Sequence, residues 1–327
     1  MNKHLPEFRS GMAWLLKTFL SEKRGFGYVY KPEAFSLAHL DRMWRKVSKG
    51  QVAMNREWAE QFMAKRPTET TTRGACRRAS IWRELARFAR RHGLADAYIP
   101  DAYTCPIHAD PYTPFIYTRE QLAALFVAAD AIKPWWLSTP RRPWMLGLLL
   151  RLLYGAGLRL GEALALRCRD FDPSQASLTL HGKNRRERII PIAPSLAERL
   201  REYLRRFPDT PDAPIFPSPK RPAPLSDYAM RDSFNQILKD AHLPLRENRQ
   251  GPRLHDLRHT FAVHRLENWI RAGEDVNAKI HLLSVYMGHK NLFATYYYLR
   301  ITSQLFPDIT RRFAETAGHA IPGEGNP

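Results

Sequence analysis

The sequence predicts a mainly α protein of two domains, with one small β-hairpin in the second domain. Three observations carry this prediction: helical patterning over most of the 327 residues, one pair of apolar segments at 177–181 and 188–192, and a proline-containing stretch at 103–116. A chain of this length can bury two hydrophobic cores. We therefore place the domains at residues 1–105 and 118–327, joined by a linker at 106–117.

The charge of the chain points to a polyanionic partner. Lys and Arg number 51 against 32 Asp and Glu, which gives a formal net charge of +19. A protein this basic repels itself unless an anion compensates the charge. Nucleic acid is the first candidate partner and an anionic membrane surface is the second.

Several other classes of protein are not expected. Cys76, Cys105 and Cys168 are three isolated thiols without a Cys-x-x-Cys pair, so neither a disulfide framework nor a zinc cluster is predicted, and a reducing cytoplasm fits. The longest apolar run, 144–158, is interrupted by Arg151 and is too short to cross a bilayer. The amino terminus lacks the cleavage site of a signal peptide.

The first domain reads as entirely helical, and its clearest helix is 73–91. Ile81, Leu85 and Phe88 have the spacing of one buried helical face. The same segment carries seven arginines against Glu84 alone. A solvated face is the ordinary interpretation of such a run, but in a chain of this charge we favour a helix that follows DNA phosphates. We expect three of these arginines to contact DNA: Arg77, Arg78 and Arg87.

The second domain is expected to begin with a capped helix and to carry a hairpin. Thr118 and Gln121 form a Thr-x-x-Gln capping box. The hairpin is expected at 177–181 and 188–192. We interpret the proline-rich segment 208–224 as a loop inside this domain. Further helices are expected at 144–154, 160–167, 195–206, 227–241, 255–271, 275–287 and 292–299.

Two cationic candidates precede the proline-rich loop. Arg159 follows Gly155 and Gly157 and is expected in the first turn of a helix, where the helix dipole disfavours a positive charge. Glu162, three residues on, can hold its guanidinium. Lys183 is expected at the tip of the hairpin, where it could act as an acid if its side chain reached a site. Taken singly, each has an ordinary alternative: a surface salt bridge and a solvated turn lysine.

The remaining candidates follow the loop. His255 and Arg258 share one face near a helix start, where backbone N–H groups favour anions. His255 and His259 also have a metal-ligand spacing, but the glutamate of a metalloprotease helix is missing. His289 follows Gly288, a predicted helix end. Tyr296, Tyr297 and Tyr298 fall on the helix predicted at 292–299, and at least two of them are expected to be ordinary core residues.

Together these stretches resemble the tyrosine recombinase, or phage integrase, family. The resemblance rests on Gly157-Leu158-Arg159-Leu160-Gly161-Glu162, on Gly182-Lys183, on His255-Asp256-Leu257-Arg258-His259, and on Gly288-His289 through Tyr298, in that order. It covers residues 118–300, and it is similar in part to recombinases of small bacterial transposable elements. It implies the two-domain recombinase architecture, with an N-terminal helical core-binding domain and a C-terminal catalytic domain.

The resemblance also implies a reaction and a role for each residue. Family members cut and rejoin DNA strands through a 3′-phosphotyrosyl intermediate, without metal, ATP or another cofactor. By resemblance Tyr298 is the nucleophile, nine residues after His289, and the cations around it should ease its ionisation. Arg159 and Arg258 would stabilise the oxyanion, and His289 would donate a further hydrogen bond. Lys183 would protonate the leaving oxygen, and His255 would position Tyr298 or accept its proton.

The expected partner is double-stranded DNA, bound by a homotetramer that can be monomeric in free solution. Outside the first domain, we expect DNA contacts from Arg186, Arg188 and Arg253. An apolar stripe of Leu305, Phe306, Ile309 and Phe313 either packs on its own domain or docks on a neighbouring copy. The alternatives are a type IB topoisomerase, a DNA-binding accessory protein without catalysis, and a metal-dependent nuclease that uses His255, His259 and His289.

Overall fold

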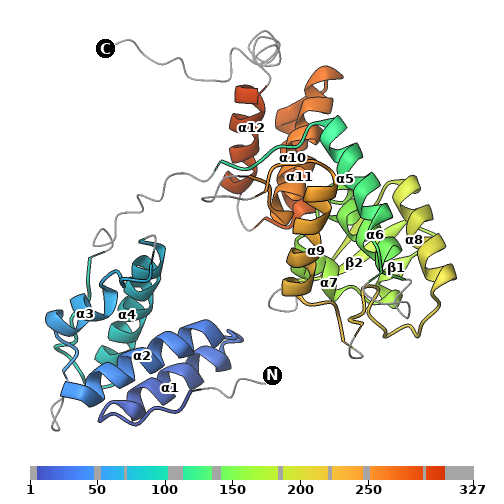
Figure 1. Cartoon of the computed structure of the whole chain (residues 1–327). Helices are drawn as coiled ribbons and strands as arrows, with labels where there is room; N and C mark the ends of the chain where they lie inside the picture. The colour runs from blue at the N-terminus through green and yellow to red at the C-terminus, as the bar shows by residue number, and fades with distance from the viewer. Residues whose placement is uncertain are drawn as a thin grey trace, which may run out of the picture. The chain divides into compact units, whose positions relative to one another are not determined.

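The computed structural model describes residues 6–47, 53–69, 72–101, 113–134, 141–182, 187–219, 223–245, 251–289 and 292–305. The chain separates into two compact units, Met1–Thr113 and Pro114–Pro327. Figure 1 shows the helical first unit and the mixed second unit. Each unit is described by itself.

In the described residues of the first unit, four helices pack around an aromatic core. They are α1 (Ala13–Gly25), α2 (Lys31–Val47), α3 (Arg56–Met63) and α4 (Arg73–Arg91). Trp82 of α4 lies at the centre of the core: its ring centroid is 6.3 Å from that of Trp44 and 6.0 Å from that of Phe62. The predicted helix 73–91 is confirmed residue for residue.

Arg78 belongs to the packing of this unit, which corrects its assignment to DNA. Its side chain is only 4% exposed. Nε donates to the carbonyl of Phe62 at 2.8 Å, Nη2 donates to that of Ala64 at 2.6 Å, and Nη1 lies 2.5 Å from Glu69 Oε1. Because these groups surround the guanidinium, it ties the end of α3 to α4 and is not open to a phosphate.

Cys76 is also not a free thiol. It is disulfide-bonded, which corrects the expectation of three isolated cysteines. A disulfide requires two Cα atoms within about 7 Å of each other, and distance along the sequence does not reveal this. Cys168, in the second unit, is free.

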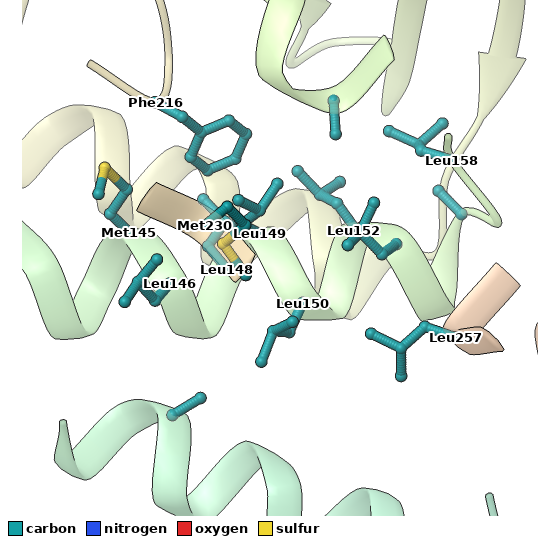
Figure 2. Packing of buried hydrophobic residues seen from close by; sticks show 14 of the residues in the cluster. Met145, Leu146, Leu148, Leu149, Leu150, Leu152, Leu158, Phe216, Met230 and Leu257 are labelled. Carbon is teal, nitrogen blue, oxygen red and sulfur yellow. The ribbon is translucent and has the colours of Figure 1, made fainter. Parts of the chain in front are cut away.

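The second unit surrounds one apolar helix. Its first elements are α5 (Arg119–Ala131), α6 (Arg141–Gly155) and α7 (Leu160–Ala165), and Thr118 and Gln121 form the predicted capping box of α5. Of the nine residues 145–153 of α6, all but Arg151 are buried, as expected for a helix covered on nearly all sides. Figure 2 shows the α6 leucines among Phe216, Met230 and Leu257 from later parts of the chain.

A three-stranded antiparallel sheet follows α7. After a short 3-10 helix, η2 (Cys168–Asp170), come β1 (Phe171–Asp172), β2 (Ser177–His181) and β3 (Glu187–Pro191), in the order β1-β2-β3. The predicted hairpin is confirmed, with β3 beginning one residue earlier than expected. The strand β1 was not predicted, because two residues are too short to show an alternating pattern.

The described part of this unit continues with α8 (Pro194–Arg206), α9 (Asp227–Asp240), α10 (Leu254–Arg271), α11 (Val276–Met287) and α12 (Phe293–Leu305). The proline-rich segment lies inside the unit as predicted, since Ile215 and Phe216 are buried and the Tyr203 hydroxyl donates to the Ile215 carbonyl at 2.8 Å. A separate apolar cluster joins α10, α11 and α12 and contains Tyr298. The side chain of Leu305 and residues 306–327 lie outside the described part, and so does the predicted apolar stripe.

Candidate active site

Arg159 and Arg258 both lie next to the turn at Gly157, a position that requires glycine. Gly157 has φ +59°, and a Cβ there would stand 2.5 Å from the ring of Phe261. Only glycine fits this turn without displacing α10. The carbonyl of Gly157 points to Arg258, whose Nη1 donates to it at 2.6 Å. The turn therefore brings the end of α6 and the middle of α10 to one place.

Arg159 is the residue before α7, one position earlier than the first turn in which it was expected. Its Nη1 lies 2.7 Å from Glu162 Oε1, as predicted, and its backbone N–H donates to Glu162 Oε2 at 3.0 Å. Nη2 donates to the carbonyl of Gly288 at 2.9 Å. The side chain is 40% exposed, so the remaining N–H groups can meet a ligand.

Glu162 holds a second arginine as well. Nη1 and Nη2 of Arg188 lie 3.1 and 3.0 Å from its two oxygens, and Arg188 Nε donates to the Tyr286 carbonyl at 3.2 Å. Although burial alone would raise the pKa of this carboxyl, hydrogen bonds from Arg188 and Arg159 lower it to about 2. Arg188, expected to contact DNA, thus braces the carboxylate that orients Arg159.

Arg159, Arg188 and Arg258 form an arginine cluster. Arg258 is its most enclosed member, with 1% of its side chain exposed. Besides the bond to Gly157, its Nη2 donates to the carbonyl of Met287 at 2.6 Å. Burial and the nearby charge of Arg159 lower the pKa of Arg258 to about 10. It remains a cation at neutral pH, held by the main-chain carbonyls of Gly157, in the turn after α6, and of Met287, the last residue of α11.

The end of α11 supplies the other side of the cluster. Gly288 closes this helix in the left-handed conformation with φ +65°, as predicted for a glycine at a helix end. A Cβ there would stand 2.9 Å from the guanidinium of Arg188. Gly288 therefore gives both the turn into His289 and the room for Arg188.

Tyr298 is buried, and its hydroxyl contacts His259. Oη lies 3.0 Å from Nδ1 of His259, and 3% of the residue is exposed. His255 was expected to make this contact, but its ring lies against that of His259, with centroids 4.7 Å apart. The two histidines are one helical turn apart on α10, so sequence spacing alone does not distinguish them.

The ionisation of Tyr298 differs from the expectation. Burial raises its pKa above the usual value, and the charges of Arg258 and Arg159 lower it only in part. The cations do lower the pKa of Tyr298, as expected, but burial raises it by more, so in the protein without DNA the net pKa is above the ordinary value. Burial also lowers the pKa of His259 to about 3, with the charges of His255 and Arg253 acting in the same direction. His259 is therefore neutral near pH 7, and a neutral imidazole has a free lone pair.

His289 stacks on Tyr298 and is fixed by a threonine. The ring centroids of His289 and Tyr298 are 5.9 Å apart at 22°. Nδ1 of His289 lies 2.7 Å from Oγ1 of the fully buried Thr295. Burial and the charge of Arg258 lower the pKa of His289 to about 4. Thr295 lies one helical turn before Tyr298 and carries no motif that would predict this contact.

The other two tyrosines differ from the prediction that at least two of the three are core residues. Tyr296 is 43% exposed and Tyr297 is half-buried. Burial raises the pKa of Tyr297. Tyr298 is the one of the three that is fully buried and lies within hydrogen-bond distance of a histidine.

The remaining predicted residues fall into two groups. Lys183 and Arg186 lie outside the described residues. Arg77 is half-exposed and pairs with Glu33 at 2.6 Å, Arg87 is exposed on α4, and Arg253 lies 3.1 Å from the buried Asp256. Among the described residues no group of three or more His, Cys, Asp or Glu side chains could hold a metal ion. In the same part of the chain, no helix is long and apolar enough to cross a membrane.

We expect Glu162→Gln to disorganise the cluster and to destabilise the second unit. Its folded-state pKa of about 2 is below the unfolded value, so its ionised form stabilises the fold above the unfolded pKa, and this contribution is lost as the pH falls towards 2. The amide nitrogen of glutamine is a donor and cannot replace the carboxylate oxygen that accepts from the Arg159 backbone N–H and from Arg188 Nη2. Breaking a buried ion pair costs about 3 to 5 kcal/mol. Denaturant unfolding at pH 7 measures this loss, and Glu198→Gln, in an exposed pair with Arg201, is the matched control. Equal stability of the two variants would contradict the role of Glu162.

Three comparisons find related proteins. The phage integrase family matches residues 118–304. A putative integrase/recombinase y4rB of Sinorhizobium fredii is 30% identical over 262 residues, which cover 78% of this chain and 81% of the relative. Tyrosine recombinase XerC of Nitrobacter winogradskyi is 30% identical over 296 residues, which cover 83% of this chain and 86% of the relative.

Solved structures share the fold at low sequence identity. The post-cleavage complex of XerH site-specific recombinase with a palindromic difH substrate aligns with a TM-score of 0.63 at 16% identity, covering 92% of this chain and 84% of that one. The Tn1549 transposon integrase bound to transposon right-end DNA aligns with a TM-score of 0.59 at 14% identity, covering 87% and 94%. The two-unit architecture thus recurs in these proteins.

Proposed function

Because the chain belongs to the phage integrase family, we propose that the arginine cluster and Tyr298 form the centre at which it cuts and rejoins DNA. The chain is a tyrosine-type site-specific recombinase, and its partner is DNA. The observation that carries the assignment of residues is the position of the Tyr298 hydroxyl, 3.0 Å from His259 and beside two guanidinium groups.

The reaction begins at Tyr298. Its hydroxyl oxygen attacks the scissile phosphorus, and the bond from phosphorus to the 5′-oxygen breaks as the new bond forms. The phenolic proton goes to Nδ1 of His259, which lies within hydrogen-bond distance of the hydroxyl. His255, whose ring packs on His259, holds that imidazole in place. The product is a 3′-phosphotyrosyl bond and a free 5′-hydroxyl.

Arg159 and Arg258 stabilise the charge that develops on the phosphate oxygens. Guanidinium groups donate in a planar fork that matches phosphate geometry. Both arginines are held by main-chain carbonyls and Glu162 before substrate arrives, so little reorganisation is needed during the reaction. His289, oriented by Thr295, donates from its other ring nitrogen.

Lys183 protonates the departing 5′-oxygen. This role rests on its place in the Gly182-Lys183 sequence between β2 and β3. In the reverse direction the same lysine accepts the proton of an incoming 5′-hydroxyl, which attacks the phosphotyrosine and releases Tyr298. The energy of the phosphodiester is kept in the covalent bond, so the chemistry needs neither ATP nor a metal ion.

The proposed number of subunits follows from the number of DNA strands that must be cut. Recombination of two duplexes requires four strand cleavages, and each copy of the chain offers one Tyr298. We therefore propose a homotetramer on two DNA sites; a lambda integrase structure contains a dimer on one core site.

We also propose that residues 1–105 bind DNA as a separate domain, with Arg77 and Arg87 exposed on α4, and that the chain serves integration of a mobile element. Since the chain acts on DNA, we propose that the reaction takes place in the cytoplasm.

Covalent trapping tests this function. A duplex that carries the recombination site, with a nick just beyond the scissile phosphate, loses its 5′-hydroxyl fragment after cleavage and cannot be rejoined. We expect a denaturation-resistant complex of protein and DNA 3′ end, formed equally well in excess chelator. Cleavage that chelator abolishes would identify a metal-dependent nuclease. Binding without cleavage, on a site that the same protein recombines in cells, would contradict the proposed centre.

A further inference from the structure

His289 is held by two different segments of the second unit. Its backbone N–H donates to the carbonyl of Ser284 at 3.0 Å, in the turn that ends α11. Its side chain contacts α12: Nδ1 lies 2.7 Å from Oγ1 of Thr295, and the ring stacks on that of Tyr298. The end of α11 therefore places the residue, and α12 orients its imidazole.

The direction of the hydrogen bond between Thr295 and His289 determines whether His289 can donate to a phosphate. Because burial and the charge of Arg258 lower the pKa of His289 to about 4, the ring is neutral near pH 7 and carries one N–H and one lone pair. If the proton were on Nδ1, the threonine oxygen would accept it, and Nε2 would present a lone pair to the phosphate oxygens. If the hydroxyl donates to Nδ1, the proton is on Nε2 and is available to the substrate.

We propose that Thr295 is a positioning residue for His289: its hydroxyl donates to Nδ1 and thereby keeps the imidazole proton on Nε2, where it can be given to the phosphate. This proposal rests on the role of His289 given above. The bond fixes both the plane of the ring and its tautomer before substrate arrives. The neutral imidazole is then a donor without having to take up a second proton.

The position of Thr295 on α12 links this donor to the nucleophile. Thr295 and Tyr298 are three residues apart, so they share one face of the helix, and both are buried. Helix α12 packs against α10, which carries His259, and against α11, which leads to His289 (Figure 1). The position of α12 that brings the Tyr298 hydroxyl to His259 thus also brings the Thr295 hydroxyl to His289. One helix supplies the nucleophile and completes the phosphate donor together.

Thr295→Val removes the hydroxyl and keeps a side chain of nearly the same shape. In the full-length chain we expect it to slow single-turnover cleavage of the nicked site by about 10 to 100-fold, the usual cost of losing a group that orients a histidine at a metal centre. Thr295→Ser keeps the hydroxyl and should recover most of the rate. Thr302→Val is the matched control, because Thr302 is buried on the same helix and donates to the carbonyl of Tyr298. It should cleave at close to the native rate.

A double-mutant cycle separates an effect through His289 from a general disturbance of α12. His289→Ala removes the donor and should slow cleavage by about 100 to 1,000-fold. Adding Thr295→Val to this variant should slow cleavage by no more than about twofold further, because the side chain on which Thr295 acts is already gone. An equal loss in both backgrounds would show that Thr295 acts on the packing of α12, and the positioning role would be rejected.

The position of the proton can be observed directly in the full-length protein without DNA. Nitrogen NMR distinguishes the protonated nitrogen of a neutral imidazole from the unprotonated one, and the His289 signals are those that disappear in His289→Ala. We expect the proton on Nε2 in the native protein. A proton on Nδ1 would mean that Thr295 accepts the bond, which overturns the proposal.

Failure of this proposal differs from failure of the proposed function. If Thr295→Val cleaves at the native rate while His289→Ala is slow, His289 is a donor that does not need Thr295. If His289→Ala also cleaves at the native rate, His289 is not a donor, and the proposal is rejected together with its premise. If the native protein forms no covalent complex, the whole centre is rejected.

Discussion

Replacing Tyr298 by Phe is expected to abolish covalent attachment to DNA, with cleavage reduced by at least about 10,000-fold, as for removal of other enzymatic nucleophiles. The change deletes one oxygen from a residue that is 3% exposed and keeps the ring stacked on His289. Folding and DNA binding should therefore be retained. Only the atom 3.0 Å from His259 is lost. The measurement is the yield of denaturation-resistant complex on a nicked site.

Tyr296→Phe and Tyr297→Phe are the matched controls for this experiment. Both residues precede Tyr298 on α12, and neither is fully buried. Each control should form the covalent complex at close to the native rate. An adduct that persists in Tyr298→Phe and disappears in one of the controls would move the nucleophile to that tyrosine.

Replacing Arg258 by Lys should lower the rate of strand cleavage by about 100 to 1,000-fold, the usual cost of removing one preorganised oxyanion donor. Lysine keeps the charge, but its single ammonium cannot donate to the carbonyls of Gly157 and Met287 and also to a phosphate in a planar fork. Single-turnover cleavage with bound DNA measures the effect. The affinity for DNA should change little, since this arginine is 1% exposed in the free protein.

Arg265→Lys provides the control on the same helix. Arg265 is exposed on α10, with its guanidinium 5.6 Å from the ring of Phe261. It should cleave at nearly the native rate. If Arg258→Lys does the same, or if it loses DNA affinity in proportion to its rate, Arg258 does not act on the transition state.

Local signals in the sequence predicted much of the fold. The capping box of Thr118 and the helix 73–91 depend on neighbours three or four residues apart, and both are present as expected. The pair of Arg159 and Glu162 is equally local, since it joins residues at i and i+3. The hairpin was found because its strands carry an alternating pattern and lie close together in sequence.

What the sequence did not reveal depends on contacts between distant segments. His259, and not His255, meets Tyr298 because of the rotation of α10 relative to α12, which spacing along one helix does not contain. Arg188 reaches Glu162 across 26 residues, and Arg78 is enclosed by the end of α3. In a chain so rich in arginine, sequence alone cannot separate a guanidinium that braces the fold from one that meets phosphate.

The carbonyls that hold Arg159 and Arg258 belong to the main chain of Gly157, Met287 and Gly288. Every amino acid carries the same carbonyl oxygen, so a change of side chain does not remove these acceptors. Among the three residues that supply these carbonyls, we therefore expect substitutions to be harmful at Gly157 and Gly288, because their backbone has positive φ. Surfaces that read the DNA sequence can then diverge, and a new target site can be acquired, without rebuilding the reaction centre.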